Sequence, residues 1–281
     1  MKFKLFKDGL LALRQNDNWS LYHCFGVEEK APVLVPVDFA QDVSNLKVYD
    51  NIGLAIIRNS VFSLLTGQKI LNDASDIKIV QIGNMALVVS ENSVGRYVMK
   101  VQIWNGQEVL SEYDCSGYSY SKHYLAIKYG NIWSIYQMNG TIIDECAFIA
   151  DEAEICGNLI IVRKICDQSL YSITDKAFLK QKQLRIVCSK KQNLALCAQI
   201  GDKNLSIYNG KWHTLSDVED FGLIDGIENV FYIKQKGKYI LYKEDMTRFM
   251  EAMYPEGVDF VACDAGVALI INNGKPAFYK I

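Results

Sequence analysis

A short apolar segment that recurs along the chain constrains its fold more than any other feature. It places alanine between branched or long aliphatic residues, as in "GLAIIRN" (53–59) and "NLALCAQI" (193–200). Successive copies are spaced by about 37 residues, a period typical of propeller and solenoid repeats. The copies are centred on Ala12, Ala55, Ala86, Ala126, Ile160, Ala195, Phe231 and Ala268.

Each copy is surrounded by further short strand patterns. A strand that ends in a glycine corner precedes it, as in "IKIVQIGN" (77–84), and an aromatic strand such as "WSIY" (133–136) follows it. A turn then leads into a fourth short run, and at 139–140 and 209–210 that turn is Asn-Gly. Asn-Gly readily adopts the positive φ angles of a two-residue hairpin. Each repeat is therefore predicted to form a four-stranded antiparallel meander.

One thin meander cannot bury both of its faces, so neighbouring copies must stack, and radial stacking also protects the sheet edges. We expect an all-β fold, a β-propeller of about eight four-stranded antiparallel blades, with residues 1–281 as a single domain. Seven blades are the alternative, if the copy at Ile160 or Phe231 is an irregular insertion. The last blade ends on a third strand, "KPAFYKI" (275–281). The only helix expected is one or two turns within 243–254.

Composition excludes several classes of protein. The chain has 32 acidic and 30 basic residues, so no global charge favours nucleic acid or an anionic membrane as a partner. Its first apolar stretch is interrupted by charges and no later run is long enough to cross a bilayer, so we expect a cytoplasmic protein. The eight cysteines lie singly, without zinc spacing, and are interpreted as reduced core residues. No metal or cofactor is expected.

The stretch "YLAIKYGNIWSIYQMNGTII" (124–143) resembles a unit of the WG-repeat (KWG) family, and 11–22, 53–70 and 194–211 resemble it less fully. Units of that family combine a small-apolar strand, a Gly-Lys-Trp-Gly-type strand start and an Asn/Asp-Gly turn. Ser20 and Ser134 stand where the family has glycine after tryptophan. The resemblance implies a propeller-like stack used for binding, with no shared catalytic residues.

The sequence contains no familiar catalytic or nucleotide-binding motif. An alternative function is a propeller-type hydrolase or lyase that acts on a sugar or small metabolite at the central channel. It requires two or more of these residues to converge at one mouth of the channel: Asp50, Asp114, Glu154, Asp264 and His123. A third alternative, nucleic-acid binding, requires one continuous face formed by Lys180, Lys182, Arg185, Lys190 and Lys191.

Tyrosine is unusually frequent, with 16 residues, and concentrates in 111–130. Tyrosines there either pack between sheets as strand formers or form an aromatic binding surface. The candidate binding residues are Tyr113, Tyr118, Tyr120 and His123. The leading function is a non-catalytic scaffold, monomeric by itself, that binds a partner protein through blade loops, as an inhibitor or immunity protein or as a complex subunit. The longest irregular stretches, 24–46, 90–100 and 243–257, are the first places to look for contacts.

Overall fold

The computed structural model describes most of the chain. The described residues are 2–6, 9–25, 33–72, 74, 76–91, 99–165, 167–180, 184–189, 194–224, 230–251, 253–264 and 267–280, without the side chains of Cys263 and Asp264. They form antiparallel strands in chain order and two short 3-10 turns, η2 (Asp38–Ala40) and η3 (Asp50–Ile52). No helix among these residues is long and apolar enough to cross a membrane.

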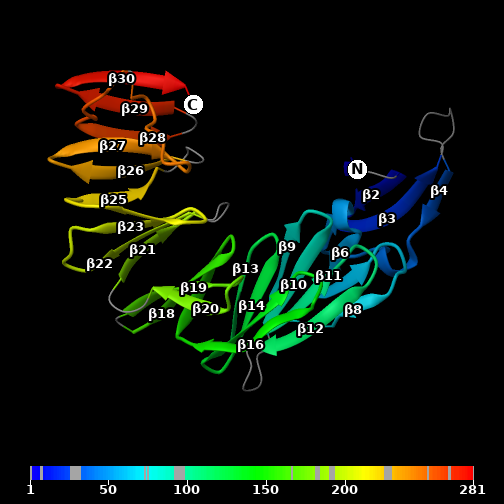
Figure 1. The fold of residues 1–281 in the computed structure, drawn as a ribbon. Helices are drawn as coiled ribbons and strands as arrows, with labels where there is room; N and C mark the ends of the chain where they lie inside the picture. Colours follow the sequence, from blue (N-terminus) through cyan, green and yellow to red (C-terminus); the bar gives the residue numbers. More distant parts are fainter. Residues whose placement is uncertain are drawn as a thin grey trace. The chain divides into compact units, whose positions relative to one another are not determined.

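The first four sheets each contain four strands in chain order (Figure 1). Sheet 1 comprises β1 (Lys2–Leu5), β2 (Leu10–Gln15), β3 (Asn18–Phe25) and β4 (Val33–Pro36). Sheet 2 comprises β5 (Leu46–Tyr49), β6 (Leu54–Ile57), β7 (Ser60–Ser63) and β8 (Lys69–Leu71). Sheet 3 comprises β9 (Asp76–Ile82), β10 (Met85–Glu91), β11 (Met99–Trp104) and β12 (Val109–Cys115). Sheet 4 comprises β13 (Gly117–Tyr120), β14 (Tyr124–Tyr129), β15 (Ile132–Gln137) and β16 (Ile142–Ile149).

The remaining sheets continue the pattern, but the last two have three strands within the described residues. Sheet 5 comprises β17 (Glu152–Cys156), β18 (Leu159–Lys164), β19 (Asp167–Ser172) and β20 (Ala177–Lys180). Sheet 6 comprises β21 (Leu184–Cys188), β22 (Ala195–Gln199), β23 (Leu205–Tyr208) and β24 (Trp212–Leu215). Sheet 7 comprises β25 (Asp220–Leu223), β26 (Val230–Gln235) and β27 (Lys238–Lys243), and sheet 8 comprises β28 (Phe260–Asp264), β29 (Val267–Asn272) and β30 (Lys275–Lys280).

The expected fold class is confirmed: the described chain is all-β and is built from eight consecutive blade-like meanders. Every repeat centre named from the sequence lies on the second strand of its sheet and is at most 2% exposed. The copies at Ile160 and Phe231 lie on β18 and β26, so neither is an irregular insertion. The alternative of seven blades is therefore excluded.

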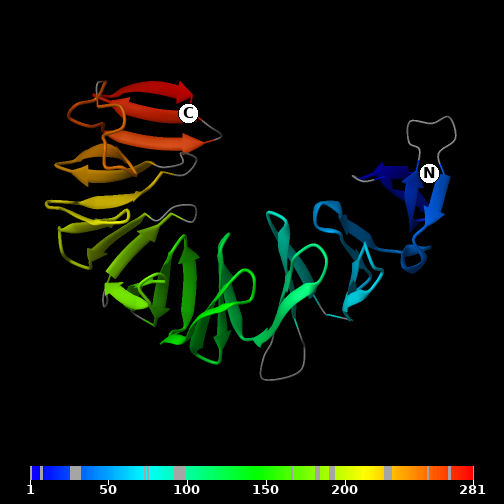
Figure 2. The same ribbon diagram turned by 45° about the vertical axis from the view of Figure 1, so that its right-hand side comes forward.

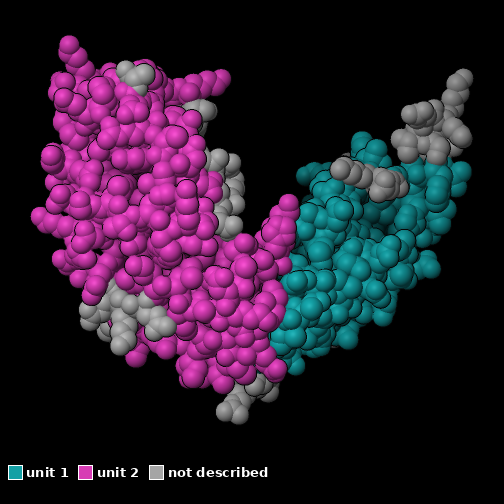
Figure 3. Space-filling model, viewed as in Figure 1, with its two compact units in different colours: residues 1–118, 127–130, 136–142 teal, residues 119–126, 131–135, 143–281 magenta. Residues whose placement is uncertain are grey.

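The chain forms two compact units, each described by itself (Figure 3). Unit 1 contains residues 1–118, 127–130 and 136–142, and unit 2 contains residues 119–126, 131–135 and 143–281. Buried apolar clusters join consecutive sheets within each unit, and Figures 1 and 2 show sheets 6, 7 and 8 stacked face to face in unit 2. The outer face of sheet 1 exposes Phe3 and Leu5, and that of sheet 8 exposes Phe278.

An aromatic residue on the third strand usually stands directly opposite the repeat centre. Ala55 pairs with Phe62, Ala86 with Trp104, Ala195 with Tyr208 and Ala268 with Tyr279. A methyl side chain leaves room for the neighbouring ring, which accounts for the recurrence of alanine at this position. The buried Trp104 indole also donates from Nε1 to the Ile52 carbonyl, 2.7 Å away.

The expected helix at 243–254 is wrong: its described residues form turns. Met246 and Met250 have positive φ angles of 68° and 62°, which interrupt a right-handed helix. The amide of Phe249 donates to the Leu241 carbonyl on β27 at 2.8 Å, instead of to a carbonyl one helical turn earlier. Pairing with the sheet therefore replaces helix formation.

Candidate functional site

Sheet 7 departs most clearly from the repeat, because residues 244–258, here called the cover segment, take the place of a fourth strand along β27. The segment touches β27 through two isolated bridges, Tyr239 with Val258 and Tyr242 with Arg248. Tyr239 and Val258 exchange both backbone hydrogen bonds, at 2.8 and 2.9 Å. The cover segment thus satisfies the edge of β27 without forming a regular ladder.

The residues of the cover segment explain its course. The Asp245 carboxylate accepts from the backbone N–H and the hydroxyl of Thr247, at 2.9 and 2.6 Å, which is an Asx turn. These bonds, the side-chain bond first, lower the pKa of Asp245. Phe249 packs against the apolar cluster between sheets 7 and 8, and the Tyr254 hydroxyl lies 2.6 Å from that of Tyr279 on β30. The segment is anchored at both its centre and its end.

Gly257 allows the segment to return to the sheet. Its φ is +91°, and a Cβ atom there would lie 2.7 Å from the backbone oxygen of Tyr239. Real side chains do not tolerate such an approach to backbone, so glycine is required at this position. The space enclosed under the segment is only ≈ 10 Å³, so the segment lies tightly on β27.

An open pocket of ≈ 680 Å³ lies at the start of the cover segment, between sheets 6 and 7. Its walls are the β23–β24 turn and the end of β27, and it is lined by Asn209, Gly210, Lys211, Lys243, Glu244 and Asp245. Asn209 fixes the two walls, because its Nδ2 donates to the Glu244 carbonyl at 2.8 Å. The His213 Nε2 lies 3.1 Å from the Asn209 Oδ1 and holds that amide.

A second open pocket, of ≈ 560 Å³, lies at the end of the cover segment. It is lined by Glu256, by residues of the β26–β27 hairpin including Lys236 and Lys238, and by Ser216 and Asp217 between sheets 6 and 7. Lys238 pairs with Asp259 at 2.6 Å, and this hydrogen bond, with the Asn273 amide, lowers the pKa of Asp259. Both pockets mix cationic and anionic side chains, and Met253 of the cover segment is 54% exposed.

The candidate residues of the tyrosine-rich stretch fall on different elements. Tyr113 lies on β12, Tyr118 and Tyr120 on β13, and His123 in the turn that follows β13. Tyr120 is 37% exposed and His123 is exposed, whereas Tyr113 and Tyr118 are half-buried. The ring of His123 stacks edge-on with Tyr124, at 6.3 Å between centroids. The sequence expectation that these four residues bind a partner stays a prediction.

Part of the tyrosine-rich stretch packs inside unit 1. The rings of Tyr113 and Tyr136 lie 4.6 Å apart, and the Tyr113 hydroxyl is 3.4 Å from the Gly140 carbonyl. Burial raises the pKa of Tyr113 and Tyr129 and raises that of the neighbouring Cys115 thiol to about 11. Burial thus disfavours the charged forms of these three side chains.

The candidate residues of the enzyme alternative lie on several elements. Asp114 on β12 is 3.9 Å from the Lys100 amine, and Glu154 on β17 pairs with Arg163 at 2.7 Å. Asp50 begins η3, and the side chain of Asp264 lies outside the described residues. No group of three or more His, Cys, Asp or Glu residues within the described chain is arranged to hold a metal ion.

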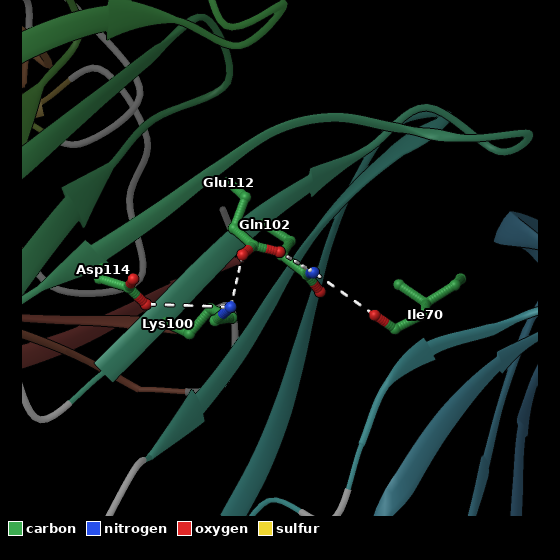
Figure 4. Close-up of polar contacts among 5 residues, drawn as sticks. All are labelled: Ile70, Lys100, Gln102, Glu112 and Asp114. Carbon is green, nitrogen blue, oxygen red and sulfur yellow. Dashed lines mark hydrogen bonds and ion pairs between the residues drawn. The ribbon is translucent and has the colours of Figure 1, made fainter. Parts of the chain in front are cut away.

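Asp114 belongs to a polar network on the outer strands of sheet 3 (Figure 4). The Lys100 amine pairs with Glu112, and Gln102 donates from Nε2 to the other oxygen of Glu112 at 2.6 Å. The Lys100 hydrogen bond, opposed by burial and aided by Gln102, lowers the pKa of Glu112. Gln102 is 3% exposed and lies 3.5 Å from the Ile70 carbonyl of sheet 2. The charged groups of this network therefore interact with one another, and their contacts join the two outer strands of sheet 3.

The basic stretch of the nucleic-acid alternative is only partly described, because Lys182, Lys190 and Lys191 lie outside the described residues. Lys180 sits 5.2 Å from the Trp212 ring centroid, and its amine is 3.3 Å from the Ser206 hydroxyl. Arg185 pairs with Asp220 at 2.7 Å and stacks on Phe221. These two cations are engaged by neighbouring residues of the protein.

Sequence reasoning identified 243–257 as an irregular stretch but missed the pocket residues contributed by other elements. Asn209 and Glu244 stand 35 residues apart, close to one repeat, because their contact joins adjacent sheets. Arg185 and Asp220 have the same separation. The repeat period could have identified such pairs, because residues about one period apart can lie side by side on neighbouring sheets.

No family model matches the chain, and no curated protein matches it. Similar solved structures include Hsv2p of Kluyveromyces lactis (11% identity, 96% of this chain and 88% of that chain, TM-score 0.37). Others are apo AztD from Citrobacter koseri (15% identity, 88% and 84%, TM-score 0.38) and a eukaryotic initiation factor (9% identity, 88% and 86%, TM-score 0.40). The class of the protein follows from its own sheets: it is an all-β, propeller-type repeat protein. The WG-repeat resemblance remains a resemblance.

Proposed function

We propose that this protein is a non-catalytic scaffold that binds a partner protein through the cover segment and its two flanking pockets. The observation that carries the proposal is the break in the repeat at sheet 7, where an irregular segment lies between open pockets of ≈ 680 and ≈ 560 Å³. A rigid repeated scaffold with one irregular surface is typical of binding proteins. The scaffold acts in the cytoplasm, as an inhibitor or immunity protein or as a complex subunit.

The chemistry of this surface favours a protein over a small anion or a nucleic acid. Lys211 and Lys243 share the first pocket with Glu244 and Asp245, so the local charge is balanced. Polyanions require an excess of positive charge, whereas protein interfaces combine an apolar centre with a polar rim. Met253 of the cover segment, which is 54% exposed, supplies an adaptable apolar contact.

Affinity capture from the native host, followed by reconstitution with the purified candidate partner, tests the proposal. We expect Lys211→Glu/Lys243→Glu to weaken binding about tenfold or more, because it places four negative groups in one pocket. Lys176→Glu/Lys203→Glu is the matched control, since it makes the same charge change at exposed residues that line neither pocket.

Calorimetry with the purified partner distinguishes this surface from the tyrosine-rich stretch. Retention of full affinity by Lys211→Glu/Lys243→Glu would reject the pocket surface. Loss of affinity in Tyr120→Ser/His123→Ala alone would assign binding to the exposed residues near β13 instead. Turnover of a sugar or small metabolite would replace the proposal with the enzyme alternative.

A further inference from the structure

Among the described residues, the outer edge of β30 is the clearest position in the repeat that has no neighbouring strand. In sheets 1 to 6 the third strand pairs with a fourth strand, and in sheet 7 the cover segment bridges to β27. β30 is the third strand of sheet 8, and among the described residues it pairs with β29 alone. The outer edge of β30 therefore corresponds to the strand edge that a fourth strand or the cover segment covers in the other seven sheets.

The register identifies which backbone groups this edge presents. Asn272 and Lys275 flank a two-residue turn, Asn273–Gly274, with φ angles of 51° and 71°. In such a hairpin the flanking pair is hydrogen-bonded, and hydrogen-bonded pairs alternate along the ladder. Ala277 and Tyr279 therefore bond to β29, whereas the backbone groups of Pro276, Phe278 and Lys280 point outward.

Pro276 agrees with this assignment. Proline has no N–H, and within sheets it is tolerated where that group would face away from the neighbouring strand. The outward groups are then the carbonyl of Pro276 and both the N–H and the carbonyl of Phe278 and of Lys280. Their alternation matches the acceptors and donors of an antiparallel strand centred opposite Phe278.

We propose that β30 binds an extended segment of a partner protein, which adds an antiparallel fourth strand to sheet 8. Strand addition of this kind draws its affinity from main-chain hydrogen bonds and its specificity from alternate side chains. Lys280 lies on the same face as Phe278, and Lys275 stands at the start of the strand on the opposite face. An acidic residue opposite Lys280 and an apolar residue opposite Phe278 complement the edge.

The charge of the edge favours such a partner over a second copy of this chain. Both charged residues of β30 are lysines, so acidic segments are attracted. In a paired dimer of two β30 strands centred on Phe278, each Pro276 would stand opposite a Lys280 and leave one carbonyl without its N–H partner. A partner without proline opposite Lys280 leaves only the one carbonyl opposite Pro276 without its donor, whereas the dimer leaves two.

A displayed library of short random peptides, selected on the full chain, tests this proposal. We expect enrichment of sequences with an apolar residue two positions from an acidic one, and binding about tenfold or more weaker to Phe278→Pro. Phe278→Pro removes only an outward N–H from the backbone and leaves the ladder with β29 intact. Phe278→Ala is the matched control, because it removes the ring but keeps the N–H.

Amide hydrogen exchange supplies a second measurement on the wild-type protein. The amides of Phe278 and Lys280 should exchange fast in the free protein and slow about tenfold when an enriched peptide binds, while those of Ala277 and Tyr279 are slow in both states. Equal enrichment on wild type and Phe278→Pro, or no enrichment, overturns the proposal. A wild-type dimer in sedimentation that Phe278→Pro dissociates also overturns it and assigns the edge to a second copy.

This surface is separate from the pockets beside the cover segment. Lys211→Glu/Lys243→Glu should leave peptide binding at β30 unchanged, so failure of one surface does not affect the other.

Discussion

Sheets 3 and 7 differ in what covers the outer edge of the third strand, the region called here the rim of the sheet. In sheet 3 the fourth strand β12 pairs with β11 from Val109 to Cys115, and Lys100, Gln102 and Glu112 bind one another across the strands. In sheet 7 the cover segment touches β27 at two isolated bridges and leaves charged side chains around two pockets. Where the ladder is complete the charged side chains form one network, and where it is broken several charged side chains line open pockets.

The contrast shows how a repeat protein separates scaffold from surface. The core residues of the two sheets are equally buried: Trp104 in sheet 3 and Phe231 in sheet 7 are both at most 2% exposed. The difference lies at the position of the fourth strand. A sequence can change there at a low cost in folding free energy.

The largest effect is expected from Gly257→Ala, which breaks the sheet 7 rim. The added Cβ atom would lie 2.7 Å from the Tyr239 backbone oxygen, and residue 257 has a φ of +91°, which strains any residue other than glycine. We therefore expect the cover segment to lose about 3 kcal/mol of local stability. Exchange of the Tyr239 and Lys243 amides, which donate to the cover segment, should then rise about hundredfold.

Gly237→Ala is the matched control for this substitution. Gly237 also has a positive φ, +74°, but nothing lies within 4 Å of its added Cβ. Only the conformational cost remains, about 1 kcal/mol. Equal effects of the two substitutions on the Tyr239 amide would show that the close contact at Gly257 does not hold the segment.

A smaller effect is expected from Lys100→Met, which opens the network of the sheet 3 rim. It leaves Glu112 without its cation beside the buried Gln102, and we expect a loss of about 1–2 kcal/mol in the free energy of unfolding. Lys238→Met breaks the single pair with Asp259 in sheet 7 and should cost about 0.5 kcal/mol or less. Urea denaturation compares the two, and a larger cost for Lys238→Met would contradict the contrast between the rims.

The sequence was sufficient to predict the sheets because the same apolar signal is repeated. Every centre falls on a second strand, including Phe231, where alanine is absent. The sequence did not predict which neighbouring sheet each repeat centre packs against. Ala12 and Ala126 pack toward the following sheet, whereas Ala55 and Ile160 pack toward the preceding one. Strands buried on both faces are apolar at odd and even positions, so the pattern does not fix which residue faces which neighbour.

From the sequence, only the location of the candidate site could be predicted, and not its turns or contacts. The irregular composition of 243–257 distinguished it from a strand, but its turns depend on contacts with β27, such as the Phe249 amide on the Leu241 carbonyl. The tyrosine-rich stretch gave the stronger compositional signal, and part of it, Tyr113 with Tyr136, packs inside unit 1. Tyrosine content alone does not distinguish packing from binding.

A pH dependence of the sheet 3 rim follows from the lowered pKa of Glu112. A carboxyl group with a folded pKa below its unfolded value contributes stability above the unfolded pKa and loses it as pH falls through the folded pKa. The free energy of unfolding of Glu112→Gln should therefore lie below that of wild type at neutral pH, by about 1 kcal/mol, and converge with it in acid. Glu108→Gln, at an exposed residue directly before β12, is the charge-matched control. A gap between wild type and Glu112→Gln that persists in acid would contradict the charge-based explanation.

The smallest effect is expected from Tyr113→Phe on the same rim. The Tyr113 hydroxyl reaches the Gly140 carbonyl only at 3.4 Å, and phenylalanine keeps the ring contact with Tyr136, so stability should change by about 0.5 kcal/mol or less. Tyr171→Phe is the comparison, because its buried hydroxyl donates to the Asp144 carboxylate and its loss should cost about 1–2 kcal/mol. If thermal denaturation gives both substitutions the same cost, the Tyr113 hydroxyl contributes as much to stability as the buried Tyr171 hydroxyl does, which contradicts the prediction. If Tyr113→Phe instead weakens partner binding at unchanged stability, the tyrosine-rich stretch contributes to the binding surface.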